Sequence, residues 1–436
     1  MKTKIKNLAK NTFVRNVLTV ATGTAGAQAI TMAFAPVITR LYGPEAYGVM
    51  GVFMSTVAVL TPIAALTYPI AIVLPKDDRD AKAIARLSVL ISILVFLLLS
   101  SCLLTFGDTL LTLLNLESIS SFLLFIPIYM LLSAWLQVIQ QWLIRKKQYK
   151  ITAKVAVSQA AVVSGTKAGF GWQSPTSTAL IVISTLGIAF QILQLLAAIE
   201  KSENAENFSK KSKALRPFTG LKELAYRHRD FPFFRAPQVF INAASQSLPV
   251  IMLASLFGPA AAGFYSIGKT VLGLPTTLIG KSVSDVFYPR ITETFNEGKS
   301  VNKLLVKATG SLALVCVVPF SIVIIFGPSL FEFVFGQEWI KAGEYASWMA
   351  LWSMFAFINR PSVSVIPVLG LQSYFLIYEV FSLLSRGAAL FIGFYIYSSD
   401  VTAVILFSIT SAFLNAILIT FTIRFARKSD SKRFNI

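Results

Sequence analysis

The sequence predicts an all-α, polytopic membrane protein with twelve transmembrane helices. We expect two six-helix lobes, related by a pseudo-twofold axis along the membrane normal. Three observations support this fold class. Of the 436 residues, 55% are hydrophobic and only 14% are charged. Apolar stretches of about 20 residues, the length that crosses a bilayer, recur along the whole chain. One Gly-Pro motif also stands at matching places in the two halves. The composition and the long apolar stretches exclude a soluble multidomain protein.

The expected helices are apolar stretches separated by short polar or turn-forming segments. The fifth stretch gives the weakest signal, because it contains two lysines and several Ser, Thr and Gly residues. A basic segment precedes the first stretch, which is too long for a signal peptide and lacks a clear cleavage site, so we expect a retained helix. The twelve stretches are residues 16–39, 47–74, 84–106, 121–144, 152–172, 177–199, 236–257, 263–288, 304–327, 343–367, 372–397 and 401–423.

The basic residues predict the orientation of these helices, because Lys and Arg are retained on the cytoplasmic side of a membrane. With the N-terminus inside, cytoplasmic segments and helix ends contain 33 of the 39 Lys and Arg residues. The opposite side contains only Arg40 and Lys341. An odd number of helices would break this pattern, so we expect both termini in the cytoplasm. The net charge of +19 therefore follows the membrane topology, and we expect no nucleic-acid partner.

The longest polar interruption divides the chain after the sixth expected helix. It places an N-terminal lobe in residues 1–200, a basic cytoplasmic inter-lobe loop in residues 201–235 and a C-terminal lobe in residues 236–436. We interpret the loop as a solvated linker near anionic lipid headgroups. His228 in this loop is isolated, and Cys102 and Cys316 lie in apolar stretches, so neither a metal site nor a disulfide framework is expected.

The Gly-Pro motif joins the first two helices of each lobe. Gly43-Pro44 in RLYGPEAYG matches Gly258-Pro259 in SLFGPAAAGFYS at an offset of 215 residues. Glycine can end a helix with a left-handed backbone, and proline is tolerated at the first position of the next helix. A second similarity links FGDTLLTLLN from Phe106, expected after the third helix, with FGPSLFEFVFG from Phe326, expected after the ninth. Lobes of six helices enter the membrane in the same direction, an arrangement typical of alternating-access transporters with a cavity between the halves.

The first helix of each lobe carries a polar stripe. Thr24, Gln28 and Thr31 share one helical face, and so do Asn242 and Gln246. Polar groups are unfavourable toward lipid, so such stripes suit either a water-filled cavity or hydrogen bonds between helices. The sequence is compatible with both interpretations.

Charged residues inside the expected helices are candidates for function. Arg386 lies near the middle of the eleventh helix, and Lys269 and Lys281 lie in the eighth. Lys281 can instead pair with Asp285 four residues later, and Lys269 can extend its ammonium group toward the interface. Glu379, seven residues before Arg386, is a candidate partner for the guanidinium.

No motif indicates an enzyme. The segment GLPTTLIGKS at residues 273–282 resembles a phosphate-binding loop, but six residues rather than four separate its glycines, and it lies within an expected membrane helix. No nucleophile elbow, zinc-protease motif or pair of catalytic acids occurs in the sequence. We therefore expect no cofactor, and we expect transport to depend on an ion gradient or the membrane potential.

The sequence of residues 226–293 is YRHRDFPFFRAPQVFINAASQSLPVIMLASLFGPAAAGFYSIGKTVLGLPTTLIGKSVSDVFYPRITE. This segment resembles the central segment of bacterial polysaccharide (O-antigen repeat unit) flippases. These Wzx-type proteins belong to the multidrug/oligosaccharidyl-lipid/polysaccharide (MOP) exporter superfamily. ITRLYGPEAYGVMGVF and FGQEWIKAGEYASWMA resemble corresponding parts of the two halves. The resemblance implies a MATE-like fold and alternating-access transfer of an undecaprenyl-diphosphate-linked oligosaccharide. That transfer would run from the inner to the outer leaflet of the cytoplasmic membrane of a bacterium, for surface polysaccharide and lipopolysaccharide biosynthesis.

The resemblance also implies a cationic cavity for the diphosphate, with membrane lipids, a polysaccharide polymerase and chain-length machinery as partners. The candidate substrate-binding residues are Arg386, Lys269, Lys281, Arg40, Gln28, Asn242, Gln246, Arg290 and Arg360, and the candidates for ion coupling are Asp285 and Glu379. An ion-coupled multidrug antiporter of the same fold is an alternative, but the N-terminal lobe offers no acid deep in a helix. A flippase for the peptidoglycan precursor lipid II has the same chemistry and also remains open. A membrane scaffold without transport would not need the polar stripes.

Overall fold

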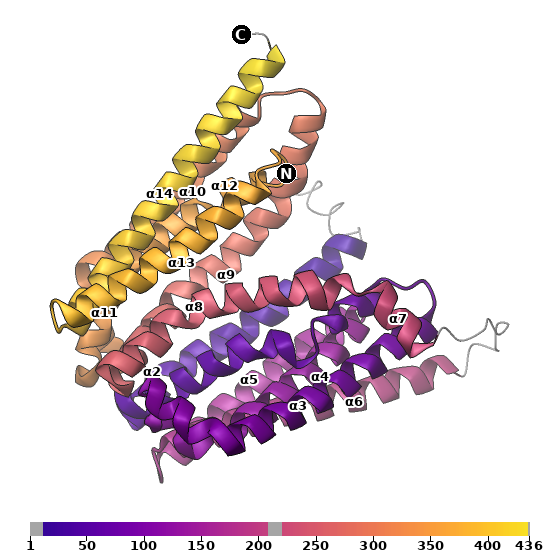
Figure 1. Ribbon diagram of the computed structural model, residues 1–436, viewed down its shortest axis with the longest axis vertical. Helices are drawn as coiled ribbons and strands as arrows, with labels where there is room; N and C mark the ends of the chain where they lie inside the picture. Colours follow the sequence, from indigo (N-terminus) through magenta and orange to yellow (C-terminus); the bar gives the residue numbers. More distant parts are fainter. Residues whose placement is uncertain (1–11, 208–219, 435–436) are drawn as a thin grey trace. The chain divides into compact units, whose positions relative to one another are not determined.

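The computed structural model describes residues 12–207 and 220–434, without the side chains of residues 12–18, 20–21, 202–207, 275–286, 289 and 432–434. All regular elements within those ranges are helical, which confirms the all-α fold class (Figure 1). The chain forms two compact units, unit 1 (Met1–Ile251) and unit 2 (Met252–Ile436). This division falls inside helix α8 (Ala236–Phe257), whereas the sequence places the lobe boundary after residue 235; the predicted lobes remain a prediction.

Unit 1 is built on helix α2 (Thr12–Ala64), whose two helical segments meet at a kink at Gly43. Helix α2 packs on α5. Helix α4 packs on α3 and α6, and α6 also packs on α5. The remaining elements of unit 1, besides most of α8, are η1 (Tyr68–Val73), α3 (Asp78–Leu114), η2 (Glu117–Phe122), α4 (Phe125–Arg145), α5 (Tyr149–Gly171), α6 (Ser177–Asn207), α7 (Leu221–Arg227) and η3 (Phe231–Arg235).

Unit 2 is centred on α11 (Ile340–Ile358), which packs on three other long helices of the unit. These are α9 (Pro259–Asn296), α10 (Val301–Phe335) and α14 (Asp400–Phe434). Helix α13 packs along α14. The other elements are η4 (Gln337–Trp339), α12 (Arg360–Val365) and α13 (Gln372–Tyr395).

The two Gly-Pro motifs have the same backbone conformation. Gly43 has φ 68° and ψ 173°, and Gly258 has φ 88° and ψ 172°. Only glycine adopts such a conformation readily, since a Cβ atom would collide with the neighbouring carbonyl oxygen. Pro259 then begins α9, where its missing N–H is not needed. The predicted turn chemistry of the repeat is therefore confirmed at both positions.

The second similarity between the halves lies inside helices, not after them. Gly107 belongs to α3 and Gly327 to α10, so the third and ninth helices extend beyond their predicted ends at residues 106 and 327. A Cβ on Gly327 would come within 2.6 Å of the Gly343 carbonyl oxygen, and one on Gly107 within 3.0 Å of Leu123. In each unit, this glycine lets the following segment approach closely.

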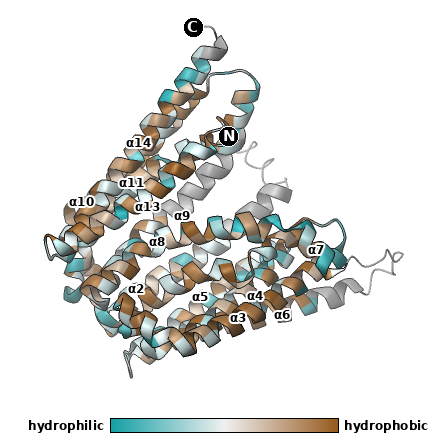
Figure 2. Cartoon of the chain, viewed as in Figure 1, coloured by the Kyte–Doolittle hydropathy of each residue, from teal (hydrophilic) through white to brown (hydrophobic). Residues whose placement is uncertain are grey.

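Among the described residues, seven helices are long and apolar enough to cross a membrane by length and composition. One of them is Thr22–Ala64, which contains the kink at Gly43. The predicted number of twelve remains a prediction. Apolar residues follow α3 along most of its length, and many of its leucines are exposed, as expected for a helix that faces lipid (Figure 2).

The second expected span, residues 47–74, is wrong at its C-terminal end. Helix α2 ends at Ala64, and the chain turns through Leu66 and Thr67, which both have positive φ. Pro69 lies in the first turn of the short 3-10 helix η1, a position that its fixed φ suits. The apolar character of this stretch comes from packing in unit 1, where Ile72 is fully buried.

Residues 221–231 differ from the solvated linker that we expected. Leu224 of α7 is 1% exposed and packs in a cluster with Ile72 and Ile84. The Tyr68 hydroxyl donates a hydrogen bond to the Ala225 carbonyl (3.1 Å), and the Thr67 hydroxyl donates one to the Phe231 carbonyl (3.1 Å). The segment that leads into α8 is therefore attached to η1 in unit 1.

Candidate functional site

Arg386 is the central candidate in unit 2. It lies in the middle of α13, is half-buried, and its Nε atom is buried without a hydrogen-bond partner among the described residues. Its guanidinium is close enough to Tyr265 of α9 and to Tyr378 and Glu379 of its own helix for electrostatic interaction. Arg386 therefore interacts electrostatically with one acid and two hydroxyl groups, without a hydrogen bond or ion pair to them among the described residues.

Glu379 does not neutralise Arg386 through direct contact. The two residues are two helical turns apart, about 10 Å along the axis at a rise of about 1.5 Å per residue. Their charges interact, but the ion pairs found among the described residues do not include this pair. The guanidinium is therefore left with hydrogen-bonding capacity for an anion.

Aromatic rings support this part of unit 2. Tyr265 is 2% exposed, and its ring packs edge-to-face on Phe407 of α14 with 6.2 Å between centroids. Phe407 in turn contacts Trp352 of α11, also at 6.2 Å. Because Tyr265 is buried against these rings, it acts as a packing residue that fixes α9 beside α14.

A buried polar stripe between α11 and α14 was missed by the sequence reasoning. Asn359, the residue that follows α11, donates from Nδ2 to Asn415 Oδ1 (2.9 Å), and Asn415 donates from Nδ2 to the Ser411 carbonyl (2.8 Å). The only signal was the spacing of Ser408, Ser411 and Asn415 on one face of α14. Within the described chain, the buried polar atoms without partners in this region include Trp352 Nε1, Asn359 Oδ1, Ser408 Oγ and Ser411 Oγ.

The other charged candidates of unit 2 lie on α9, α12 or α13. Lys269 is half-buried one turn after Tyr265 and makes an interaction, so it is not a free cation. Arg290 is exposed near the end of α9, and Arg360 is half-buried at the start of α12. Lys281 and Asp285 belong to α9, but their side chains lie outside the described residues, so their pairing remains a prediction.

The polar stripes of unit 1 are not buried between its helices. Gln28 is half-buried and makes an interaction, while Asn242 and Gln246 are exposed. Gln246 donates from Nε2 to Asn242 Oδ1 (3.0 Å) on its own helix. Arg40 is exposed in the last turn before Gly43. The hydrogen bond between Asn242 and Gln246 thus lies within one helix and does not join two helices.

Lys167 of α5 is a second cation to which the sequence reasoning assigned no role. Its ammonium nitrogen lies 3.8 Å from Met50 Sδ, and its carbonyl oxygen accepts a hydrogen bond from the Tyr42 hydroxyl (2.9 Å). It takes part in none of the ion pairs found in the described chain. The charge on Lys167 is therefore not compensated by a carboxylate in contact with it.

The chemistry available is that of cations on two long helices, α13 and α5. Arg386 offers N–H donors in unit 2, and Lys167 offers an ammonium group in unit 1. Among the described side chains, no group of three or more His, Cys, Asp or Glu residues is arranged to hold a metal ion. Each of these cations, considered within its own unit, suits the binding of an anion.

Comparison with known proteins identifies a family and a fold. Residues 37–344 match the model of a family described as polysaccharide biosynthesis protein. No curated protein matches the sequence significantly.

Several solved structures resemble the chain over nearly its whole length. An inward-facing multidrug resistance MATE family transporter of the MOP superfamily matches with a TM-score of 0.69 and 13% identity, covering 94% of this chain and 96% of that chain. The lipid II flippase MurJ in an inward closed conformation also matches with a TM-score of 0.69, at 12% identity and with coverage of 93% and 87%. A MOP superfamily transporter from Pyrococcus furiosus matches with a TM-score of 0.56, at 10% identity and with coverage of 96% of both chains. At these identities the likeness establishes a common fold.

Proposed function

Because the chain belongs to the polysaccharide biosynthesis protein family, we propose that it is a flippase for lipid-linked glycans. It transfers undecaprenyl-diphosphate-linked oligosaccharide repeat units from the inner to the outer leaflet of the cytoplasmic membrane by alternating access. The observation that carries the proposal is Arg386, a cation in the middle of an apolar helix whose Nε atom lacks a partner in the described structure. The role is transport, without a catalytic step.

The diphosphate is the part of such a cargo that most requires a binding site in the protein, since moving its charge through hydrocarbon is unfavourable. A guanidinium can hold two phosphate oxygens at once through a rigid pair of N–H donors. Lys167 adds a cation in unit 1, and Arg40, Arg290 and Arg360 add cations nearer the helix ends. The undecaprenyl chain needs no such site, because it remains in the bilayer.

Glu379 is the proposed coupling group. It interacts electrostatically with Arg386 and is half-buried. A diphosphate bound to the guanidinium would add negative charge to the surroundings of this carboxylate. Binding and release of the cargo would therefore change the environment of Glu379, which links transport to an ion gradient or the membrane potential. Asp285 is the second proposed coupling group.

The cellular setting belongs to the same proposal. We place the protein in the bacterial inner membrane with both termini in the cytoplasm, where the basic segments of the sequence belong. Its products would be used by a polysaccharide polymerase and chain-length machinery on the opposite side. Transport of lipid II is the alternative for the same site chemistry, and the match with MurJ in fold is the observation that favours it.

Reconstitution of the full chain in proteoliposomes tests the proposal. Vesicles would carry an undecaprenyl-diphosphate-linked repeat unit, lipid II, or a small cationic dye, and a membrane-impermeant probe would report cargo that reaches the opposite leaflet. We expect protein-dependent transfer of the repeat unit. Transfer of lipid II alone would support the alternative, and movement of the dye alone would replace the flippase by a drug antiporter.

A further inference from the structure

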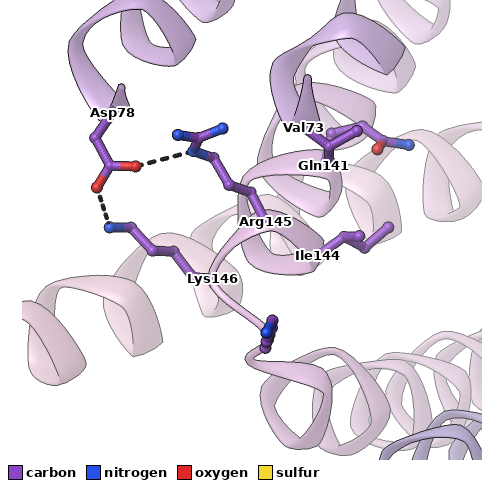
Figure 3. A pocket seen from close by; sticks show the side chains of 7 residues that line it. Val73, Asp78, Gln141, Ile144, Arg145 and Lys146 are labelled. Atoms are coloured by element: carbon purple, nitrogen blue, oxygen red, sulfur yellow. Dashed lines mark hydrogen bonds and ion pairs between the residues drawn. The ribbon is translucent and has the colours of Figure 1, made fainter. Parts of the chain in front are cut away.

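Unit 1 contains a pocket that none of the candidate transport residues lines. It has a volume of about 610 Å³ and lies where the chain between η1 and α3 meets the end of α4 (Figure 3). Most of its lining is polar or charged. The lining residues are Val73, Asp78, Gln141, Ile144, Arg145, Lys146 and Lys147.

Arg145 builds the wall of this pocket. Its Nε atom donates to Asp78 Oδ1 (2.9 Å), and its Nη1 atom donates to the carbonyls of Ile72 (3.2 Å) and Pro75 (2.6 Å). Its Nη2 atom donates to the Lys76 carbonyl (3.3 Å). All three guanidinium nitrogens are thus engaged in holding the η1–α3 junction, so this arginine supplies shape and leaves ligand binding to other groups.

The remaining cations are not balanced. Asp78 also accepts from Lys146 Nζ (Figure 3). No hydrogen bond or ion pair of the Lys147 ammonium group occurs among the described residues. Three cations, Arg145, Lys146 and Lys147, line the pocket with the single carboxylate of Asp78, so the lining carries a net charge of +2 (three minus one). The positive charges of the lining therefore outnumber its one carboxylate.

Lys147 has a backbone conformation that is unusual for a lysine, and its side chain lines the pocket. It has φ 56°, the left-handed conformation that follows the end of a helix, with its N–H donating to the Ile144 carbonyl (3.0 Å). The next N–H, of Gln148, donates to the Leu143 carbonyl (2.9 Å). Glycine is the residue that suits this position best. A lysine here is unfavourable for the backbone, and it brings an ammonium group to the pocket.

The pocket also has an apolar side. Val73 and Ile144 line it and are 37% and 41% exposed. Trp142, which lies under the ammonium groups of Lys82 and Lys146 at 5.6 and 5.1 Å, marks this end of α4 as an interfacial region. A ligand with a phosphate group and an attached hydrocarbon chain fits both sides, whereas a soluble anion would use only one.

We propose that this pocket binds the phosphate headgroup of an anionic phospholipid in the leaflet where α4 ends. Lys147 and Lys146 contact the phosphate, and the acyl chains lie along Val73 and Ile144. The bound lipid supports the η1–α3 junction, whose Ile72 packs against Leu224 of α7. The site is independent of the proposed transport function, because none of its residues belongs to the candidate substrate path.

The test uses the full chain in nanodiscs of phosphatidylcholine with increasing fractions of phosphatidylglycerol. The melting temperature of the protein is measured at each fraction, and its rise reports binding of phosphatidylglycerol. Lys147→Gly removes the ammonium group while suiting the left-handed backbone, so this variant should remain folded. We expect the apparent affinity for phosphatidylglycerol to fall roughly tenfold, as for loss of one charged contact. Lys147→Asn tolerates the same backbone and should behave alike, whereas Lys147→Arg should keep the response.

Lys150→Gln is the matched control, because Lys150 is exposed nearby and does not line the pocket. Its response to phosphatidylglycerol should equal that of the unaltered chain. An unchanged response of Lys147→Gly would overturn the proposal. So would an equal loss in Lys150→Gln, which would indicate a general surface effect. Separate additions of inorganic phosphate and undecaprenyl diphosphate identify the source, and the proposal fails if either one alone reproduces the stabilisation.

Discussion

Replacing Arg386 by alanine removes a guanidinium that makes no hydrogen bond or ion pair with the described residues of the protein. Folding should therefore lose little. In transport, the same change removes a charge-assisted contact with the diphosphate, which contributes about 1.5–3 kcal/mol. That range corresponds to a loss of about 10- to 150-fold in the rate at low substrate concentration. The structure thus predicts that the alanine variant will lose transport activity and keep most of its stability.

The assay is transfer of the lipid-linked repeat unit in proteoliposomes, followed by the impermeant probe, with the melting temperature measured in the same preparations. Arg386→Lys keeps the charge but loses the paired donors, so its rate should lie between those of the alanine variant and the unaltered protein. Arg427→Ala removes an exposed arginine of α14 and serves as the control. Its rate should match the unaltered protein.

Two results would refute the reasoning. A folded Arg386→Ala protein that transfers the repeat unit at the normal rate would show that the cargo does not use this guanidinium. A large fall in melting temperature for the same variant would show that Arg386 is a structural residue, bonded in the membrane to groups that the described structure does not supply. In either case, the assignment of the site in unit 2 would have to be abandoned.

Further substitutions test the fold and the topology. Gly258→Ala should lower the free energy of unfolding by about 1–2 kcal/mol because of its positive φ, whereas Gly220→Ala, at φ −60° with open space around it, should not; thermal melting compares them. Asn359→Leu leaves Asn415 without its donor and should cost about 1–3 kcal/mol, and replacing both asparagines should recover part of that loss in a double-mutant cycle. Gly327→Ala should destabilise α10 against α11 by about 1–3 kcal/mol, which a fall in folded yield and melting temperature would reveal. Reporter fusions should place both termini in the cytoplasm; an external signal from either one would contradict the predicted topology.

The sequence identified those parts of the fold that are determined by neighbouring residues. Gly43 and Gly258 could be predicted, because Gly-Pro specifies a left-handed turn followed by a helix start. The end of α2 could not be predicted from hydropathy, since residues 65–74 are as apolar as a membrane helix. They are apolar because of tertiary packing, with Ile72 buried against α7. The attachment of α7 was missed because Leu224 is the only buried residue in this seven-residue helix, which provides no periodic signal.

The candidate site shows the same limit. Arg386 could be identified because a charge in an apolar stretch is visible in one dimension. Asn359 and Asn415 could not be paired, since 56 residues separate them and only the packing of α11 on α14 brings them together. The expected contact between Glu379 and Arg386 gives way to a longer-range interaction, because seven residues place two side chains on one face but about two turns apart.

The attachment of α7 to η1 has a consequence for how the protein is made. The hydrogen bonds from Thr67 and Tyr68 reach residues 164 and 157 positions later in the chain. A ribosome therefore has to synthesise the chain through Phe231 before these hydroxyl groups and the cluster around Leu224 find their partners. A fragment that stops at residue 200 would leave η1 without its partners in α7 and at Phe231. A fragment meant to fold as the first half alone should therefore extend past Phe231.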